Sequence, residues 1–291
     1  MQLVTFSYRG LPRLGAKLPQ GGILDLNRAE PSLPANMIEF LNLGESGAAL
    51  AKNTLASADQ DCILPEADVT WLAPLPRPGK IIGLGNNYYG HMGIGRETPP
   101  EYPILFAKLA NTVIGPGQAI VIPPVTDQVD YEAELAVIIG KQARNVAQEH
   151  ALEFVAGYTI HNDVSARDYQ KRSSQWMLGK SFDTFGPMGP ALITADEIPD
   201  PHDLEISLTL NGLEMQRSNT RLMIFSIPYL IAYLSQVMTL EAGDVIATGT
   251  PAKTELARSV KPFIKPGDEI KISITKIGEL VNPVVAESGR A

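Results

Sequence analysis

The sequence has a single cysteine and only four histidines in 291 residues. One cysteine cannot form an internal disulfide or a cysteine-based metal site, so Cys62 in the segment DCILP is expected to be a buried apolar residue. Long apolar runs are also missing. None approaches the ~20 residues that a membrane-spanning helix needs, and the first ten residues lack the basic start and apolar core of a secretory signal. These absences predict a cytoplasmic protein that does not bind a membrane.

An excess of basic residues is lacking as well. The net charge of -8 leaves no basic stripe to neutralise a phosphate backbone, which argues against a nucleic-acid partner. What the chain does have is 44% hydrophobic residues, together with 25 glycines and 23 prolines spread along its length. This composition is typical of a globular enzyme with many turns and short strands.

Two regions are predicted. Residues 1–70 begin with short apolar runs broken by turn residues, typical of antiparallel strands, and continue with helical spacing from Leu33 to Asn53. Residues 69–80 carry three prolines and read as a stiff linker. We therefore expect a small N-terminal domain over residues 1–70 and a larger catalytic domain over residues 71–291.

The larger region is rich in strand signals. Short apolar segments separated by turns recur from residue 104 onward, and only residues 147–155 and 226–238 have helical patterns. Such an order favours an α+β fold built mainly on β-sheet over a doubly wound α/β fold. A strand at Lys80 to Leu84 leads into a segment rich in glycine and proline, and irregular loops of this kind often carry function.

The strongest chemical signal is VDYEAELAVIIG, residues 129–140. Residues two apart on a strand point to the same face, so Glu132 and Glu134 place two carboxylates side by side. Charges so close require a cation between them or a proton on one of them. The simpler alternative is a solvated face, although the apolar residues that follow indicate a buried strand.

A second acidic signal lies in GYTIHNDVSARDYQ, where an apolar strand ends at Asn162 and Asp163. Three oxygen ligands from Glu132, Glu134 and Asp163 suit Mg²⁺ or Mn²⁺ better than zinc. Asp163 has an alternative role as the N-cap of a short helical turn. His161 alternates to the opposite face from Asn162 and is interpreted as structural.

Several other residues are candidates for contact with an anionic substrate. Arg167 and Gln170 are three residues apart and share a face on a helical turn, and Lys180 lies in a segment rich in glycine and aromatic residues. Thr250, at the end of a strand, has a hydroxyl and an N–H to offer a carboxylate. His91 lies in the loop after Leu84, either as a general base or as a merely exposed histidine.

Seven segments in order make the chain resemble the fumarylacetoacetate hydrolase family, in particular bacterial members with a small N-terminal domain. They are GNNYYGH, FAKLANTVIGPG, VDYEAELAVIIGK, AGYTIHNDVSARDYQ, GKSFDTFGPMGP, LNGLEMQ and GDVIATGTP. The resemblance implies a mixed β-sandwich or roll core, a homodimer, and Mg²⁺ or Mn²⁺ on the acidic triad. It also implies that Arg167, Gln170 and Thr250 contact the substrate, and that Lys180 and His91 are catalytic.

The substrate implied by the resemblance is a small 2-oxo acid that reacts through an enolate. Hydrolysis of a carbon–carbon bond in an acylpyruvate is the first expectation. Decarboxylation, isomerisation or tautomerisation of a 2-oxo dicarboxylic acid, such as oxaloacetate or a hydroxyhepta-dienedioate, is the alternative, and a non-catalytic binding subunit is a third. Two departures bear on the choice: Ile94 stands where hydrolytic relatives usually carry a glutamate, and Lys253 places a cation near the expected pocket mouth, which favours a dicarboxylate.

Overall fold

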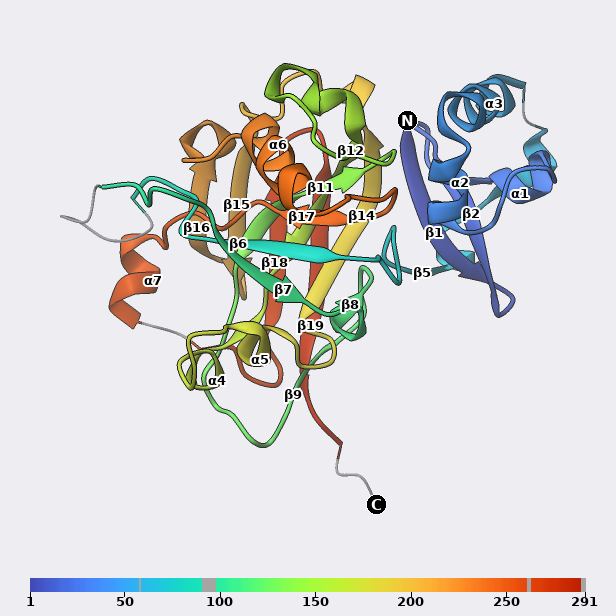
Figure 1. Ribbon diagram of the computed structural model, residues 1–291. Coiled ribbons are helices and arrows are strands. Elements are labelled where there is room, and N and C mark those ends of the chain that lie inside the picture. Colours follow the sequence, from blue (N-terminus) through green and yellow to red (C-terminus); the bar gives the residue numbers. More distant parts are fainter. Residues whose placement is uncertain (58, 91–97, 261–262, 289–291) are drawn as a thin grey trace.

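The computed structural model describes residues 1–57, 59–90, 98–260 and 263–288 (Figure 1). Most of its strands form one sheet of twelve. Their bounds are β1 Gln2–Tyr8, β2 Leu11–Lys17, β3 Ile23–Asp25, β4 Ile63–Leu64, β5 Thr70–Trp71, β6 Ile81–Gly85, β7 Ile104–Lys108, β8 Val113–Ile114, β11 Ala133–Ile139, β12 Val155–Asn162, β14 Gly186–Thr194 and β17 Val245–Ala247. The order is β4-β3-β2-β1-β14-β12-β11-β17-β6-β7, with β5 paired to β1 and β8 paired to β14.

A second sheet of five strands packs against the first. Its strands are β9 Ile120–Ile122, β15 Glu205–Leu210, β16 Leu213–Asn219, β18 Glu269–Ile274 and β19 Gly278–Ala286, in the order β16-β15-β18-β19-β9. Contacts of β11 with β15 and of β12 with β18 join the two layers. The short strands β10 Val129–Asp130 and β13 Ser165–Ala166 form a separate pair.

Helices are short and lie around the sheets. The α-helices are α1 Leu26–Ala29, α2 Met37–Asn42, α3 Gly44–Ser57, α4 Arg167–Gln170, α5 Met177–Lys180, α6 Ile227–Val237 and α7 Glu255–Val260. The 3₁₀ helices are η1 Gln60–Cys62, η2 Glu66–Asp68, η3 Ala110–Thr112, η4 Gln148–Phe154, η5 Ala195–Glu197 and η6 Thr220–Leu222. No described helix combines the length and apolar character that crossing a membrane requires.

The predicted α+β class, built mainly on β-sheet, is confirmed. The helical spacing predicted from Leu33 to Asn53 corresponds to two helices, α2 and α3, with a break at Gly44. Gly44 has a φ of 58°, a left-handed conformation that glycine adopts without a steric penalty. The helical pattern at residues 147–155 forms the 3₁₀ helix η4, whereas residues 226–238 form α6 as expected.

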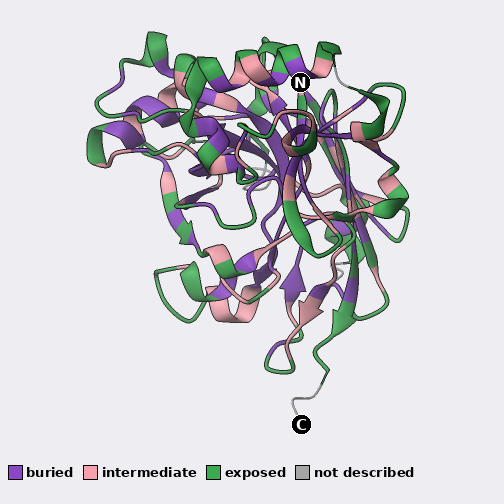
Figure 2. Cartoon of the chain, turned by 90° about the vertical axis from the view of Figure 1, so that its right-hand side faces the viewer, coloured by how far each residue is buried: buried purple, intermediate pink, exposed green. Residues whose placement is uncertain are grey.

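Strand β11 is the centre of the molecule. All seven of its residues are buried, because the five-stranded sheet covers one of its faces and apolar residues from the N-terminal region and β14 cover part of the other. Figure 2 shows the buried residues gathered in the interior and the exposed residues along the outside. Side chains on β11 therefore have little access to water, and any carboxylate there requires partners.

Candidate metal centre and active site

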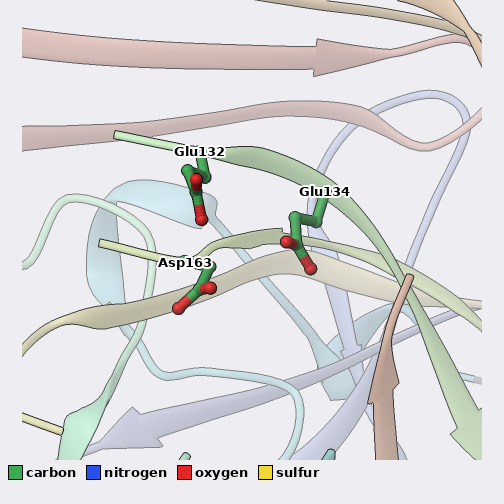
Figure 3. A group of neighbouring side chains, drawn as sticks. All are labelled: Glu132, Glu134 and Asp163. Atoms are coloured by element: carbon green, nitrogen blue, oxygen red, sulfur yellow. The ribbon is translucent and has the colours of Figure 1, made fainter. Parts of the chain in front are cut away.

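Three carboxylates meet at the beginning of β11. Ligand oxygens of Glu132, Glu134 and Asp163 all lie within 4.8 Å of one another, and Figure 3 shows the three side chains as neighbours. Their exposed fractions are 6%, 1% and 1%. The solvated-face alternative is therefore wrong, and the prediction that Glu132 and Glu134 share a face is confirmed.

The pairing of β11 with β12 brings Asp163 to the two glutamates. Ala133 is opposite Asn162 and Glu134 is opposite His161, so Asp163 follows at the strand end, where its N–H donates to the Glu132 carbonyl at 2.9 Å. The Asn162 side-chain oxygen accepts from the Glu132 N–H at 3.1 Å. Strand register and this side-chain bond fix the backbone that carries all three carboxylates.

The alternative role of Asp163 as an N-cap is wrong. The N-cap of α4 is Ala166, and no side chain accepts a hydrogen bond there. Both oxygens of the Asp163 carboxylate instead accept from lysines: Oδ1 from Lys108 at 2.8 Å and Oδ2 from Lys180 at 2.6 Å. Asp163 thus belongs to a buried ionic network.

Lys180 joins two members of the triad. Its ammonium also donates to Glu132 Oε2 at 2.6 Å and lies 4.8 Å from the centre of the Phe106 ring. Burial lowers the pKa of Lys180, but Asp163 and Glu132 more than offset it, so the pKa is raised and the group stays charged. The structure therefore brings Lys180 to the predicted site.

Arg167 and Gln170 also lie at the site and share the predicted helical face. Arg167 donates from Nη2 to Glu132 Oε1 at 2.6 Å and from Nη1 to Gln170 Oε1 at 2.9 Å. Burial lowers the pKa of Arg167, and the charges of Glu132 and Asp130 raise it by more. The guanidinium is thus a fixed positive charge beside the triad.

Lys108 is a site residue that the sequence analysis missed. Its side chain is 1% exposed, and its ammonium donates to Asp163 Oδ1, to the Val164 carbonyl at 3.1 Å and to the Lys180 carbonyl at 2.6 Å. Burial lowers the pKa of Lys108, and Asp163 opposes that effect. Because three hydrogen bonds use all three N–H groups of an ammonium, Lys108 holds Asp163 and the end of α5 in place.

Asp130 is a second missed residue. Its Oδ2 accepts from Arg167 Nε at 2.9 Å, and its Oδ1 accepts from the Lys253 ammonium at 2.6 Å. Lys253 was expected to place a cation near the site. Its ammonium and the Arg167 guanidinium each donate to one oxygen of the Asp130 carboxylate. The Lys253 ammonium also lies 4.5 Å from the centre of the Tyr131 ring.

Thr250 lies at the site through Gln216, a third missed residue. Gln216 Nε2 donates to Thr250 Oγ1 and to the Pro251 carbonyl, both at 2.8 Å, while its Oε1 accepts from the Ala133 N–H at 3.0 Å. The side chain of Gln216 is 1% exposed. It therefore ties the strand end that carries Thr250 to the start of β11.

Some of these groups line a small cavity of about 60 Å³. Its described lining includes Glu132, Arg167, Gln170, Lys180, Thr250, Phe106 and Trp176. Gly85 on β6 makes room for the wall, since a Cβ there would lie 2.4 Å from the Trp176 ring. The cavity thus joins a charged side to an aromatic side, as small-molecule sites commonly do.

The triad fits a hard divalent cation. Glu134 Oε2 is buried and has no hydrogen-bond partner among the described residues. Burial, together with the charges of Asp163 and Glu132, raises the pKa of Glu134 well above its ordinary value. A divalent cation bound by oxygen ligands would satisfy the orphaned oxygen and offset the repulsion, so the triad could bind Mg²⁺ or Mn²⁺.

His161 packs on the same face as Glu134, its cross-strand partner. It is fully buried, and burial lowers the pKa of its imidazole to about 3, so the ring is neutral.

His91 and Ile94 lie outside the described residues. The described chain just before them is anchored by Asn87, which donates to the Thr248 carbonyl at 2.8 Å and accepts from the Phe225 N–H at 2.8 Å.

Comparison with known proteins gives a family match over most of the chain. Residues 80–285 match the family model described as fumarylacetoacetate (FAA) hydrolase C-terminal. Over 290 residues the chain is 44% identical to "Oxaloacetate tautomerase FAHD2A, mitochondrial" of Bos taurus, covering 98% of this chain and 92% of the relative.

Solved structures extend the likeness to three dimensions. A 5-carboxymethyl-2-hydroxymuconate delta-isomerase from Mycobacterium smegmatis is 34% identical with a TM-score of 0.78. A maleylpyruvate hydrolase from Sphingobium, in complex with manganese (II) ion and pyruvate, is 33% identical with a TM-score of 0.83. Each alignment covers 99% of this chain and 100% of the other. The chain belongs to the fumarylacetoacetate hydrolase family.

Proposed function

We propose that the protein is a metal-dependent tautomerase or isomerase of a 2-oxo dicarboxylic acid, with oxaloacetate as the first candidate. The observation that carries this proposal is the buried carboxylate triad with cations packed around it. A carbonyl substrate bound there would meet positive charge at the point where an enolate oxygen develops. This reverses the order of the sequence-based expectations, which placed hydrolysis first.

The charges of the network favour a substrate with two carboxylates. Among the described residues it holds four acids, Asp130, Glu132, Glu134 and Asp163, and four bases, Lys108, Arg167, Lys180 and Lys253. With every group ionised, the network is neutral by itself. A divalent cation adds two positive charges, and a dicarboxylate removes them, so the loaded site is again neutral in a buried region where net charge is costly.

Tautomerisation requires only two proton transfers. One proton leaves the enol oxygen and one is delivered to the neighbouring carbon, while no carbon–carbon bond breaks and no water is consumed. A divalent cation on the triad would supply Lewis-acid stabilisation of the intervening enolate. In our proposal Arg167, Gln170 and Thr250 bind and orient the substrate, Lys180 donates to its oxygen, and His91 transfers the proton.

Two observations favour this reaction over hydrolysis. Relatives named as oxaloacetate tautomerases match nearly the whole chain at 42% to 46% identity. Ile94 also stands three residues after the loop histidine, where the resemblance to the family implies a glutamate in hydrolytic members. A tautomerase does not have to activate water, so the loss of that glutamate is compatible with it.

Hydrolysis of an acylpyruvate remains the second candidate, because the similar Sphingobium structure is named a maleylpyruvate hydrolase. A non-catalytic binding role is the third. For the proposed enzyme, Mg²⁺ and Mn²⁺ are both candidate cations, and we propose a homodimer. The predicted cytoplasmic location stays a prediction, since several relatives are named as mitochondrial.

The test follows the enol absorbance of oxaloacetate with purified protein and Mg²⁺ or Mn²⁺. We expect the band to decay faster than it does without protein, with no release of pyruvate. Acetylpyruvate and maleylpyruvate are the parallel substrates, and formation of pyruvate from them would favour hydrolysis. Turnover of these acylpyruvates without acceleration of oxaloacetate would reject the proposed tautomerase, and no turnover of any of them would favour a binding role.

A further inference from the structure

The three lysines of the network differ in how many of their N–H groups are already used. Lys108 donates to three oxygens and is saturated, whereas Lys180 donates to two carboxylates. The partner that accepts from Lys253 in the described structure is Asp130. An ammonium has three N–H groups, so Lys253 has two left to give to a ligand.

Exposure separates the cations in the same way. The side chains of Lys108 and Lys180 are 1% and 2% exposed, that of Arg167 is 19% exposed and that of Lys253 is 26% exposed. Lys253 is therefore the most open of the four to an incoming molecule. The two deeply buried lysines are bonded to carboxylates of the triad, and Arg167 and Lys253 are the two more exposed cations of the network.

Asp130 sets the position of both outer cations. Its Oδ2 binds Arg167 and its Oδ1 binds Lys253, so the two positive groups are separated by a single carboxylate. Arg167 lines the cavity itself. The backbone of Lys253 is also fixed, through a bridge to Gln216, the residue that holds Thr250. Lys253 is thus placed by two independent contacts, one to the carboxylate that also holds Arg167 and one to the residue that holds Thr250.

We propose that Lys253 is the specificity-determining residue that binds the second carboxylate of the substrate, and that Asp130 is the positioning residue that presents it. This inference rests on the proposed function, since it identifies which 2-oxo acids the site selects. An ammonium with free N–H groups beside a guanidinium is a two-point receptor for a carboxylate. A monocarboxylic 2-oxo acid would leave that receptor unused.

The experiment compares ligands that differ only in the second carboxylate. The variant Lys253→Met keeps an unbranched side chain of similar size but removes the charge that lies over the Tyr131 ring, and Lys253→Arg keeps the charge. Lys141→Met, at an exposed lysine on the Phe154 ring, is the matched control. Binding of malate and of lactate to the Mg²⁺-loaded proteins is measured by titration calorimetry, and turnover of oxaloacetate and of its 4-ethyl ester is measured by enol absorbance.

We expect wild type, Lys253→Arg and Lys141→Met to prefer malate over lactate, and Lys253→Met to lose that preference by about tenfold or more, the scale of one charge-assisted hydrogen bond. KM for oxaloacetate should rise in Lys253→Met while the ester is unaffected. An unchanged malate preference, or equal losses for malate and lactate, would overturn the inference. If Lys253→Met does not fold, Lys253→Gln is judged by the same binding criterion. Binding is measured without turnover, so the two proposals are tested separately. Inactivity on oxaloacetate would reject the proposed function, whereas the inference about Lys253 is judged by the malate preference alone.

Discussion

Lys108 is the residue whose removal should affect stability most directly. The variant Lys108→Met leaves Asp163 Oδ1 and the carbonyls of Val164 and Lys180 without their donor in a buried region. Breaking a buried ion pair by removing one partner costs about 3–5 kcal/mol. We expect a loss of that order in the free energy of unfolding, measured by urea denaturation.

Lys80→Met is the matched control for this prediction. Lys80 pairs with Asp244 at 2.7 Å, but its side chain is 36% exposed, and Asp244 keeps the backbone N–H groups of Lys80 and Glu241 as donors. Removing a partly exposed lysine of this kind should cost up to about 1 kcal/mol. Equal losses in the two variants would mean that the network around Lys108 does not stabilise the fold as described.

The sequence reveals the acidic residues more readily than their partners. Glu132 and Glu134 are found from local alternation, and Asp130 lies in the same phase, so the signal for it was present in VDYEAE. Lys108 is also in phase with Phe106 on the buried face of β7, where a lysine indicates a buried partner. That the partner is Asp163 depends on how β7 approaches the end of β12, and no local pattern contains this information.

At the scale of elements, the N-terminus of α6 carries a pH-sensitive contact. His202 Nε2 accepts from the Ile227 N–H at 3.0 Å, which requires a neutral ring nitrogen. Burial lowers the pKa of His202, and nearby Asp200 opposes this only in part. The stabilising contribution is therefore fully present well above pH 6.5, and it is lost as the pH falls, because the unfolded chain then takes up the proton more readily.

We expect the urea concentration at the unfolding midpoint of the wild type to decrease as the pH is lowered from 7.5 to 5.5. The variant His202→Gln should show a smaller decrease. His161, whose pKa is lowered to about 3, contributes in the same direction in both proteins and cancels in the comparison. His150→Gln is the control, since Glu153 raises the pKa of this exposed histidine. Parallel pH profiles for wild type and His202→Gln would contradict the role assigned to His202.

Element type could be predicted well where the pattern was long and regular. The strand signals around β11, β12 and β15 and the helix α6 are confirmed. The break between α2 and α3 was not predicted, although Gly44 offered the signal, because glycine is tolerated inside helices as well as at their ends. Residues 148–154 wind as a 3₁₀ helix, and apolar spacing does not distinguish it from an α-helix over so short a segment.

At the scale of the whole molecule, the N-terminal region is joined to the catalytic region by strand pairing. β1 pairs with β14 (Figure 1). Leu3 lies opposite Leu192, and the two leucines share an apolar cluster with Ala136 of β11. The division at residue 70 remains our proposal for domain organisation. Local sequence patterns do not contain information about contacts between residues so far apart. The sequence therefore predicted strands in the N-terminal region but not the pairing of β1 with β14.

The net charge of -8 is a property of the whole chain, whereas the described network around the triad balances its acids and bases. The proposed function requires a divalent cation to bind Glu132, Glu134 and Asp163 in this balanced site. Glu134 is the most informative of the three, because its Oε2 has no other partner among the described residues.

The most direct test measures Mn²⁺ binding to wild type, Glu134→Gln and the surface control Glu153→Gln. Binding is measured by equilibrium dialysis, with spin-resonance detection of free Mn²⁺. Loss of an outer partner of a metal ligand typically weakens affinity by about 10–100-fold, so loss of a ligand itself should weaken it by at least about tenfold. We predict one tightly bound ion per chain in wild type and Glu153→Gln, and this weakening in Glu134→Gln. Equal Mn²⁺ affinity in all three proteins would contradict the account.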